Sequence, residues 1–228
     1  MRTRPLFRLL EPLGAALARQ LSRPSGWFGR TVMTRVLNHG NRQLIEATLA
    51  ELELQAETRL LDVGFGGGLA LELAHRRGVR RLAGVDPSEA AVARLRERPG
   101  RLAGAGLSVE IASVEALPFD VGAFDAVVST NTVYFWPDLA PAFAELRRVL
   151  RPGGRLALGF SSASKLRAFD AITRHGFHLH EGAAVAAAAA AAGLAIVRLV
   201  ELHLGDTEGD LVLVAERPAA PPPTAPAA

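Results

Sequence analysis

A glycine-rich turn between a strand-like and a helix-like run constrains the fold of this chain most. The apolar run 59–63 leads into a turn in which Gly64, Gly66 and Gly68 alternate with other residues, and the run 69–77 has the spacing of a helix. Glycine has no Cβ, so its backbone can adopt a positive φ and lie very close to a ligand. A helix that begins at such a turn directs its unpaired N–H groups toward the same point. The segment therefore predicts a strand, a binding turn and a helix.

The rest of the chain alternates runs typical of strands with runs typical of helices. Strand-like runs are 59–63, 81–86, 107–112, 124–129, 155–160, 195–202 and 210–216, and helical runs are 38–52, 69–77, 88–98, 139–150 and the alanine-rich 186–192, which Gly193 should close. This alternation favours right-handed crossovers and a mostly parallel sheet with helices on both faces. The last two strands are separated by about seven residues, too few for a crossover helix, so we expect an antiparallel hairpin.

Composition limits the classes of function. A chain of 228 residues with 49% hydrophobic content suits one α/β domain with a large core. The sequence has no cysteine, which excludes disulfides, thiolate metal sites and cysteine nucleophiles. No apolar run reaches the ~18 to 20 residues needed to span a bilayer. We therefore expect a soluble, cytoplasmic protein of α/β class.

The N-terminal segment differs in charge from the rest. Within residues 1–35 seven arginines face only Glu11, and leucines at 6, 9, 10, 13, 17 and 21 have the spacing of an amphipathic helix. This helix could pack on the core, act as a lid over a pocket, or lie on a membrane surface. Because the basic excess lies outside the main domain, nucleic-acid binding is not favoured. We expect a helical extension or lid at 1–40, the main domain at 41–217, and a disordered Pro/Ala tail at 218–228.

Asp86 ends the second strand-like run, 22 residues after Gly64. In open α/β sheets a carboxylate at this place meets the hydroxyls of a ribose, although Asp86 could instead cap the helix that begins near Ser88. A dinucleotide fingerprint can be tested on the same turn. In G-x-G-x-x-G the third glycine would fall on Leu69 or Leu71, so the turn does not fit an NAD(P) site.

Three later segments complete a recognisable set. They are Ser113-Val114-Glu115-Ala116-Leu117-Pro118-Phe119, the strand-like run that ends in Ser129-Thr130-Asn131, and the turn Arg151-Pro152-Gly153-Gly154. With the glycine turn and Asp86, their order and spacing over about residues 41–160 resemble the class I S-adenosylmethionine (SAM) dependent methyltransferases. Within that family the chain is similar to the small-molecule "type 11" group, which is related to quinone and sterol C-methyltransferases. The resemblance implies a Rossmann-like, seven-stranded sheet with the antiparallel hairpin at one edge.

The resemblance also implies a set of residues for SAM. It assigns Asp62 and the three turn glycines to the methionine part, Asp86 to the ribose, Val114 and Glu115 to the adenine, and Asn131 to the methionine end. We add Phe65, Pro87 and Ser113 as neighbours in the same motifs. Relatives often have Asp where this chain has Ser113, so the hydrogen bond to the adenine amino group should be weaker here.

The residues that would act on an acceptor are less constrained. Methyl transfer from a sulfonium needs alignment more than a particular side chain, and His175, His178 or Tyr134 are candidates for a base. The spacing of His178 and His180 also suits a metal, but no acids or thiols accompany them, so we expect no metal site. Trp27, Tyr134 and Trp136 would line an apolar pocket for an aromatic or lipid-like acceptor. The alternative is a SAM-binding protein without turnover, or an adaptor that docks through its basic N-terminal helix.

Overall fold

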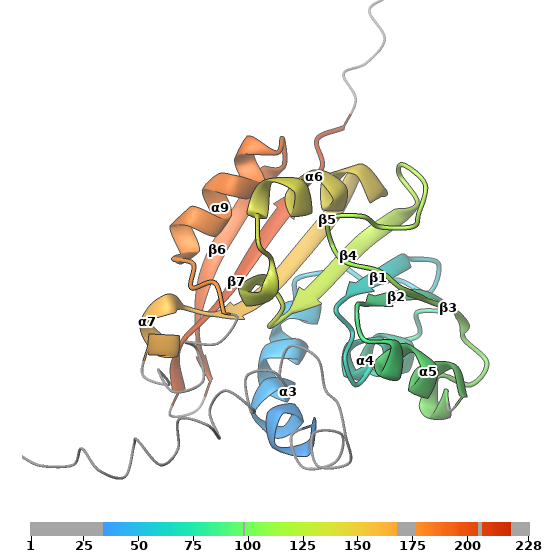
Figure 1. The fold of residues 1–228 in the computed structure, drawn as a ribbon. Coiled ribbons are helices and arrows are strands. Elements are labelled where there is room, and N and C mark those ends of the chain that lie inside the picture. Colours follow the sequence, from blue (N-terminus) through green and yellow to red (C-terminus); the bar gives the residue numbers. More distant parts are fainter. Residues whose placement is uncertain (1–33, 98, 168–176, 205–206, 220–228) are drawn as a thin grey trace, which may run out of the picture.

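The computed structural model describes residues 34–97, 99–167, 177–204 and 207–219, which form one twisted sheet covered by helices (Figure 1). The sheet has seven strands in the order β3-β2-β1-β4-β5-β7-β6. Pairing is parallel from β3 through β5 and antiparallel between β5 and β7 and between β7 and β6. The predicted mostly parallel sheet with an antiparallel C-terminal hairpin at one edge is confirmed.

The element bounds follow the predicted runs closely. The strands are β1 (Arg59–Val63), β2 (Arg81–Asp86), β3 (Gly106–Ile111), β4 (Phe124–Thr130), β5 (Leu150–Ser161), β6 (Ala195–Leu204) and β7 (Thr207–Glu216). The α-helices are α3 (Thr34–Ala50), α4 (Leu69–Arg76), α5 (Glu89–Glu97), α6 (Leu139–Val149), α7 (Ala163–Arg167) and α9 (Gly182–Ala191), with short 3-10 helices η2 (Gly100–Leu102) and η3 (Val133–Phe135).

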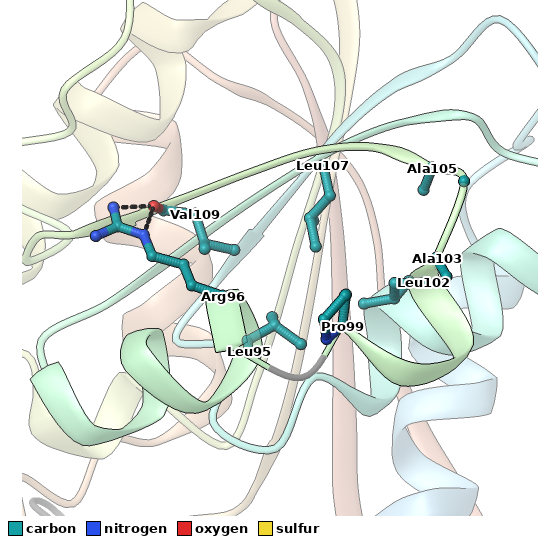
Figure 2. Close-up of a pocket in the computed structure, with 9 residues that line it drawn as sticks. Leu95, Arg96, Pro99, Leu102, Ala103, Ala105, Leu107 and Val109 are labelled. Atoms are coloured by element: carbon teal, nitrogen blue, oxygen red, sulfur yellow. Dashed lines mark hydrogen bonds between the residues drawn. The ribbon is translucent and has the colours of Figure 1, made fainter.

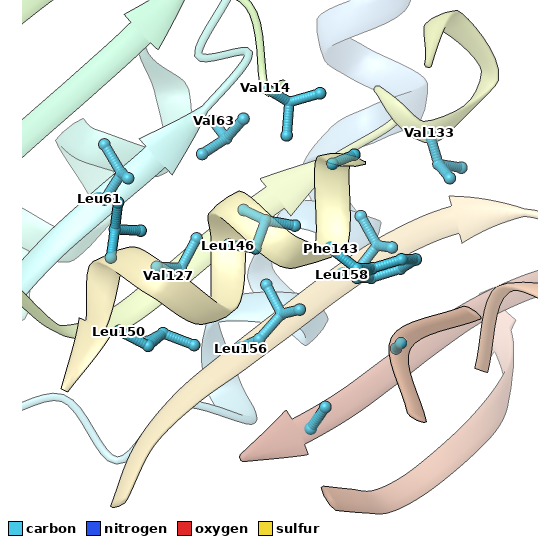
Figure 3. Close-up of a cluster of buried hydrophobic side chains, with 14 of the residues drawn as sticks. Leu61, Val63, Val114, Val127, Val133, Phe143, Leu146, Leu150, Leu156 and Leu158 are labelled. Carbon is cyan, nitrogen blue, oxygen red and sulfur yellow. The ribbon is translucent and has the colours of Figure 1, made fainter. Parts of the chain in front are cut away.

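Helices cover both faces of the sheet, because alternate residues of each strand point to opposite sides. In β1, Leu61 and Val63 belong to the cluster that packs under α6 and α9 (Figure 3). Leu60 belongs to a second cluster, shared with α3, α4 and α5. A single strand thus contributes to two cores, and its carboxyl end is held rigidly between them.

Three predicted starts differ from the structure by four or five residues, and one of them is that of α9, which begins at Gly182 and not at 186. The helix expected to begin at 38–41 begins at Thr34 and ends at Ala50, and its buried residues include Leu44 and Leu49. The strand expected from 155 begins at Leu150. The Arg-Pro-Gly-Gly segment forms an irregularity inside β5, where pairing with β4 skips from Leu150 to Arg155. Hydrogen bonds to Arg217 hold this irregularity, with Gly153 N–H donating at 2.7 Å and Gly154 C=O accepting at 2.9 Å.

The outer edge at β3 carries a shallow, mostly apolar pocket of about 310 Å³ between α5 and β3 (Figure 2). Leu95, Leu102 and Leu107 are among its lining residues. The Arg96 guanidinium donates two hydrogen bonds to the Val109 carbonyl. Val109 belongs to the edge strand β3, so this backbone acceptor of the strand is already bonded. The pocket lies outside the glycine turn and contains none of the residues predicted to bind SAM.

Some predictions lie outside the described residues. They concern the N-terminal amphipathic helix, Trp27, His175 and most of the 218–228 tail. In the part of the chain that the structure describes, no helix is long and apolar enough to cross a membrane.

The contact between Gly84 and Phe65 generates a stability prediction. A Cβ at Gly84 would lie 2.8 Å from the Phe65 ring and 3.2 Å from Leu71, so Gly84→Ala should lower the free energy of unfolding by about 1–3 kcal/mol. In a Phe65→Ala background, where the ring is gone, the same substitution should cost clearly less. Urea unfolding of the four proteins measures this, and equal costs in both backgrounds would contradict the assigned contact.

Candidate functional site

The site is built where the carboxyl ends of β1, β2 and β4 meet the glycine turn, at the point where the sheet order reverses direction. Gly64, Gly66 and Gly68 have φ values of 75°, 50° and 79°. All three lie in the left-handed region, which disfavours side chains. Gly68 is also the N-cap residue of α4, so the turn delivers the chain directly into the helix.

The three glycines face different surroundings. A Cβ on Gly64 would collide with the Thr132 methyl group, and one on Gly68 would touch Leu95 at 3.5 Å. A Cβ on Gly66 would meet no atom within 4 Å. The main chain at Gly66 is therefore bare on its outer side, and this is where the turn can receive a ligand.

Asp86 ties the turn to the end of β2. One carboxylate oxygen accepts the Gly66 N–H at 2.8 Å, and the other accepts the Ser88 N–H at 2.9 Å. The Ser88 hydroxyl in turn accepts the Ala91 N–H, so Ser88 provides the side-chain cap of α5. Burial raises the pKa of Asp86, while the N–H donors of Ser88 and Gly66 and the charge of Arg94 counteract the rise. Asp86 is therefore not the side-chain cap of α5, and its carboxylate instead bonds the backbone of Ser88 and of the turn. The ribose role of Asp86 stays a prediction.

Asp62 is a buried acid of the site with one oxygen left unsatisfied by the described residues. It is 3% exposed, and its Oδ2 has no hydrogen-bond partner among the described residues. Burial, with a smaller contribution from the charge of Asp86, raises the pKa of Asp62 to about 8. A buried polar atom without a partner costs free energy, so a donor supplied by a ligand would be stabilising here.

The end of β4 is fastened to the same turn. The Ser129 hydroxyl donates to the Val63 carbonyl at 2.6 Å, and Thr132 packs against Gly64. Between them, Asn131 has a φ of 58°, the one positive value of a non-glycine residue in the described ranges. Its N–H donates to the Gly159 carbonyl at 2.8 Å. A strained asparagine at a strand end is a feature that functional sites retain.

The loop after β3 holds the residues expected near adenine. Val114 is buried, Glu115 is half-buried and Ser113 is exposed. Glu145 of α6 accepts the Leu117 N–H at 2.9 Å, and Arg148 donates to the Leu117 carbonyl at 2.8 Å.

Sequence reasoning missed this clasp. Glu145 and Arg148 are paired at 2.6 Å on α6, and their spacing of three residues is also that of an ordinary surface ion pair. Nothing in the sequence shows that the pair holds the loop after β3.

Phe65 and Pro87, two residues predicted to bind SAM, have side chains that lie outside the glycine turn. The Phe65 side chain is 6% exposed and belongs to the core under α4, so only its backbone lies in the turn. Pro87 is exposed just beyond Asp86.

Tyr134 and Trp136, both expected from the sequence to contact the acceptor, are buried. The Tyr134 side chain is 5% exposed, and its hydroxyl donates to Asn131 Oδ1 at 2.9 Å. Burial raises the pKa of Tyr134 well above its ordinary value, which does not suit a base at neutral pH. Trp136 is 4% exposed and packs edge-on against Phe143 with ring centres 5.7 Å apart, inside the core.

The histidine pair lies beside Tyr134 in the loop before α9. The exposed His178 donates its backbone N–H to the Tyr134 carbonyl at 2.7 Å, and its ring stacks on His180 at 6.4 Å. Burial and the neighbouring His178 lower the pKa of His180. Over the described ranges, no three His, Cys, Asp or Glu side chains gather as a metal site would require.

Asp62 generates a prediction about pH. Its raised pKa means that the unfolded state loses a proton before the folded state does, so the Asp62 contribution to stability falls as pH rises from about 4 toward about 8. Asp62→Asn removes this titration. The stability gained by the variant over the wild type should therefore increase with pH, by at most about 1.4 kcal/mol per pH unit.

Asp125→Asn provides the control of opposite sign for these unfolding measurements. Hydrogen bonds from Arg59, above all, hold the pKa of Asp125 far below its ordinary value. This variant should be destabilised near neutral pH, and its deficit should shrink in strong acid. A pH-independent difference for Asp62→Asn would contradict the buried, ionisable state described above.

Comparisons with known proteins show which domain this chain is similar to. Residues 61–158 match the family model described as a methyltransferase domain. The malonyl-[acyl-carrier protein] O-methyltransferase of Geobacter sulfurreducens is 37% identical over 121 residues, covering 53% of this chain and 45% of that protein. The chain spans about half the length of most of the curated relatives it matches.

Solved structures show the same fold. A SAM-dependent methyltransferase from Mesorhizobium loti superposes with a TM-score of 0.66 at 21% identity, covering 75% of this chain and 96% of that one. Geranyl diphosphate C-methyltransferase from Streptomyces coelicolor, solved with S-adenosyl-L-homocysteine, gives 0.65 at 18% identity, covering 95% and 100%. Residues 61–158 are therefore similar to a methyltransferase domain, and the chain has the fold of the SAM-dependent methyltransferases.

Proposed function

We propose that this protein transfers a methyl group from SAM to a small apolar or aromatic acceptor. The observation that carries the proposal is the open face of Gly66, whose N–H bonds the Asp86 carboxylate, at the end of the strand that carries the unpartnered oxygen of Asp62. A Cβ would fill this space, and a ligand with hydroxyl and ammonium donors would complete it. SAM carries both kinds of donor.

Each part of the cofactor has candidate partners in the site. Asp86 would accept from the ribose hydroxyls, and Val114, Glu115 and Ser113 would border the adenine, with Glu145 and Arg148 holding their loop. The turn glycines would contact the methionine part through their backbone. An ammonium group would supply the donor and the positive charge that Asp62 Oδ2 lacks, which would also favour the ionised form of this acid.

The protein's contribution to the chemistry would be alignment. SAM supplies a methyl group on a positively charged sulfur, which needs no activation by the protein. The rigid carboxyl ends of β1, β2 and β4 would hold the cofactor, and the acceptor would be oriented against it with water excluded. A base would be needed only for an acceptor that keeps its proton, and the exposed His178 stays a candidate for that role.

The half-buried aromatic side chains after β4 support an apolar acceptor. Phe177 stacks on Tyr134 at 5.7 Å and meets Phe135 edge-on at 4.9 Å, so two loops far apart in the sequence form one aromatic cluster. The relatives named above are by name a malonyl-[acyl-carrier protein] O-methyltransferase and a geranyl diphosphate C-methyltransferase, so one acts on oxygen and the other on carbon.

The cofactor role of Gly66 has a matched test. Gly66→Ala and Gly100→Ala both introduce a Cβ at φ near 50° with no atom within 4 Å, so both should cost a similar ~1 kcal/mol of backbone strain. Only Gly66→Ala should weaken binding of S-adenosylhomocysteine, by at least about tenfold, because its methyl group fills the ligand's space. Isothermal titration calorimetry and thermal melts check this, and equal affinities in the two variants would refute the assigned site.

Turnover has a separate test. Incubation with SAM labelled in its methyl group and a fractionated metabolite extract should yield a labelled small molecule with the wild type and not with Asp86→Ala. Extraction into organic solvent should recover the label if the acceptor is apolar. Cofactor binding without any labelled product would instead support the non-catalytic, SAM-binding alternative.

A further inference from the structure

A continuous series of polar contacts connects Asn131, just after β4, to β7 and α7. The Tyr134 hydroxyl donates to Asn131 Oδ1 at 2.9 Å and accepts the backbone N–H of Ser161. The Ser161 hydroxyl donates to Asp210 Oδ1 at 2.6 Å, and Lys165 Nζ donates to Asp210 Oδ2 at 2.7 Å. The series therefore joins β4, η3, β5, β7 and α7, and Lys165 is the single lysine of the sequence.

These contacts are shielded from water. Tyr134 is 5% exposed, Asp210 is 6% exposed, and the Lys165 side chain is 23% exposed. Hydrogen bonds between buried groups are expensive to break, because the groups left behind cannot pair with water. Ser161 and Asp210 are also direct partners in the antiparallel ladder of β5 and β7, so the sheet fixes their spacing.

The direction of each hydrogen bond determines how the Asn131 amide lies. A tyrosine hydroxyl has one proton, and because it accepts from Ser161, that proton is available for Asn131. Asn131 Oδ1 is therefore the acceptor, and the amide NH₂ group lies on the other side of the side chain. The backbone of Asn131 adds a second constraint, since its left-handed conformation is strained and must be held by its surroundings.

The other flank of Asn131 is fixed to the glycine turn. Ser129 bonds to Val63, its hydroxyl lies 2.5 Å from that of Thr132, and Thr132 packs on Gly64. Asn131 is thus held from two sides, by the turn and by Tyr134. The Asn131 side chain therefore has little conformational freedom, and a binding group held in this way is preorganised for its ligand.

We propose that Tyr134 is a positioning residue, whose hydroxyl orients the Asn131 amide toward the methionine end of SAM and is itself held by the series Ser161, Asp210 and Lys165. This inference rests on the proposed role of Asn131 in cofactor binding. It gives Tyr134 a role different from the base or substrate contact expected from the sequence. The loss of its hydroxyl should act on the cofactor through Asn131 alone.

The experiment is a double-mutant cycle read by calorimetry with two ligands. Tyr134→Phe keeps the ring that stacks on Phe177 and removes the hydroxyl. Tyr134→Phe and Asn131→Ala should each weaken S-adenosylhomocysteine binding about 5- to 30-fold, and the double variant should bind no more weakly than Asn131→Ala. Binding of 5′-methylthioadenosine, which lacks the amino-acid end, should change less than twofold in all three.

Two further variants separate positioning from general loosening of the fold. Phe143→Leu alters a fully buried core ring, and should lower the melting temperature while leaving S-adenosylhomocysteine affinity unchanged. Lys165→Met removes only the end of the series, and should weaken S-adenosylhomocysteine about two- to fivefold without affecting 5′-methylthioadenosine. This second variant also keeps the test decisive if Tyr134→Phe fails to fold.

The outcomes are distinguishable. A wild type that binds neither ligand overturns the proposed function and this inference with it. A wild type that binds both, with Tyr134→Phe unchanged, with equal losses for both ligands, or with additive effects in the double variant, overturns the inference alone.

Discussion

The hydrogen bond between the Gly66 N–H and the Asp86 carboxylate is the interaction on which the site depends. It joins the turn after β1 to the end of β2 and leaves the outer face of Gly66 bare. The bond forms only if Gly66 adopts a positive φ and if β1 and β2 are in register, which the pairing of Val63 with Val85 fixes. This one hydrogen bond therefore requires both the conformational freedom of glycine and the correct pairing of β1 with β2.

Charge is arranged differently at the two ends of the sheet. At the amino ends of the strands, Asp125 is paired with Arg59 and Arg151 at 3.0 Å and 2.6 Å. At the carboxyl ends, Asp62 and Asp86 are buried without an ion pair among the described residues, and the pKa of each is raised. The first arrangement satisfies its carboxylate, and the second leaves two buried acids without a cationic partner among the described residues. Only the second has the character of a binding site.

The local motifs made much of the fold predictable. β1 and β2 have the predicted bounds, because short apolar runs ended by glycine or an acid leave little choice of boundary. The start of β5 was misplaced, since its irregular segment is held by Arg217, more than sixty residues away in the sequence. The clasp of Glu145 and Arg148 on the loop after β3 was missed for the same reason. Such contacts depend on tertiary proximity that no local pattern contains.

The sequence by itself determined the order of elements, the positions of the glycines with positive φ and the two acids of the site, because these follow from backbone sterics and from residue periodicity. Only the tertiary structure decided what each side chain faces. Phe65 fills the core, Trp136 is buried against α6, and the hydroxyl of Tyr134 is committed to Asn131 and Ser161. The physical reason is that a side chain's partners are set by packing between elements distant in the chain, and a buried hydroxyl bonds to whichever polar group the fold brings within reach.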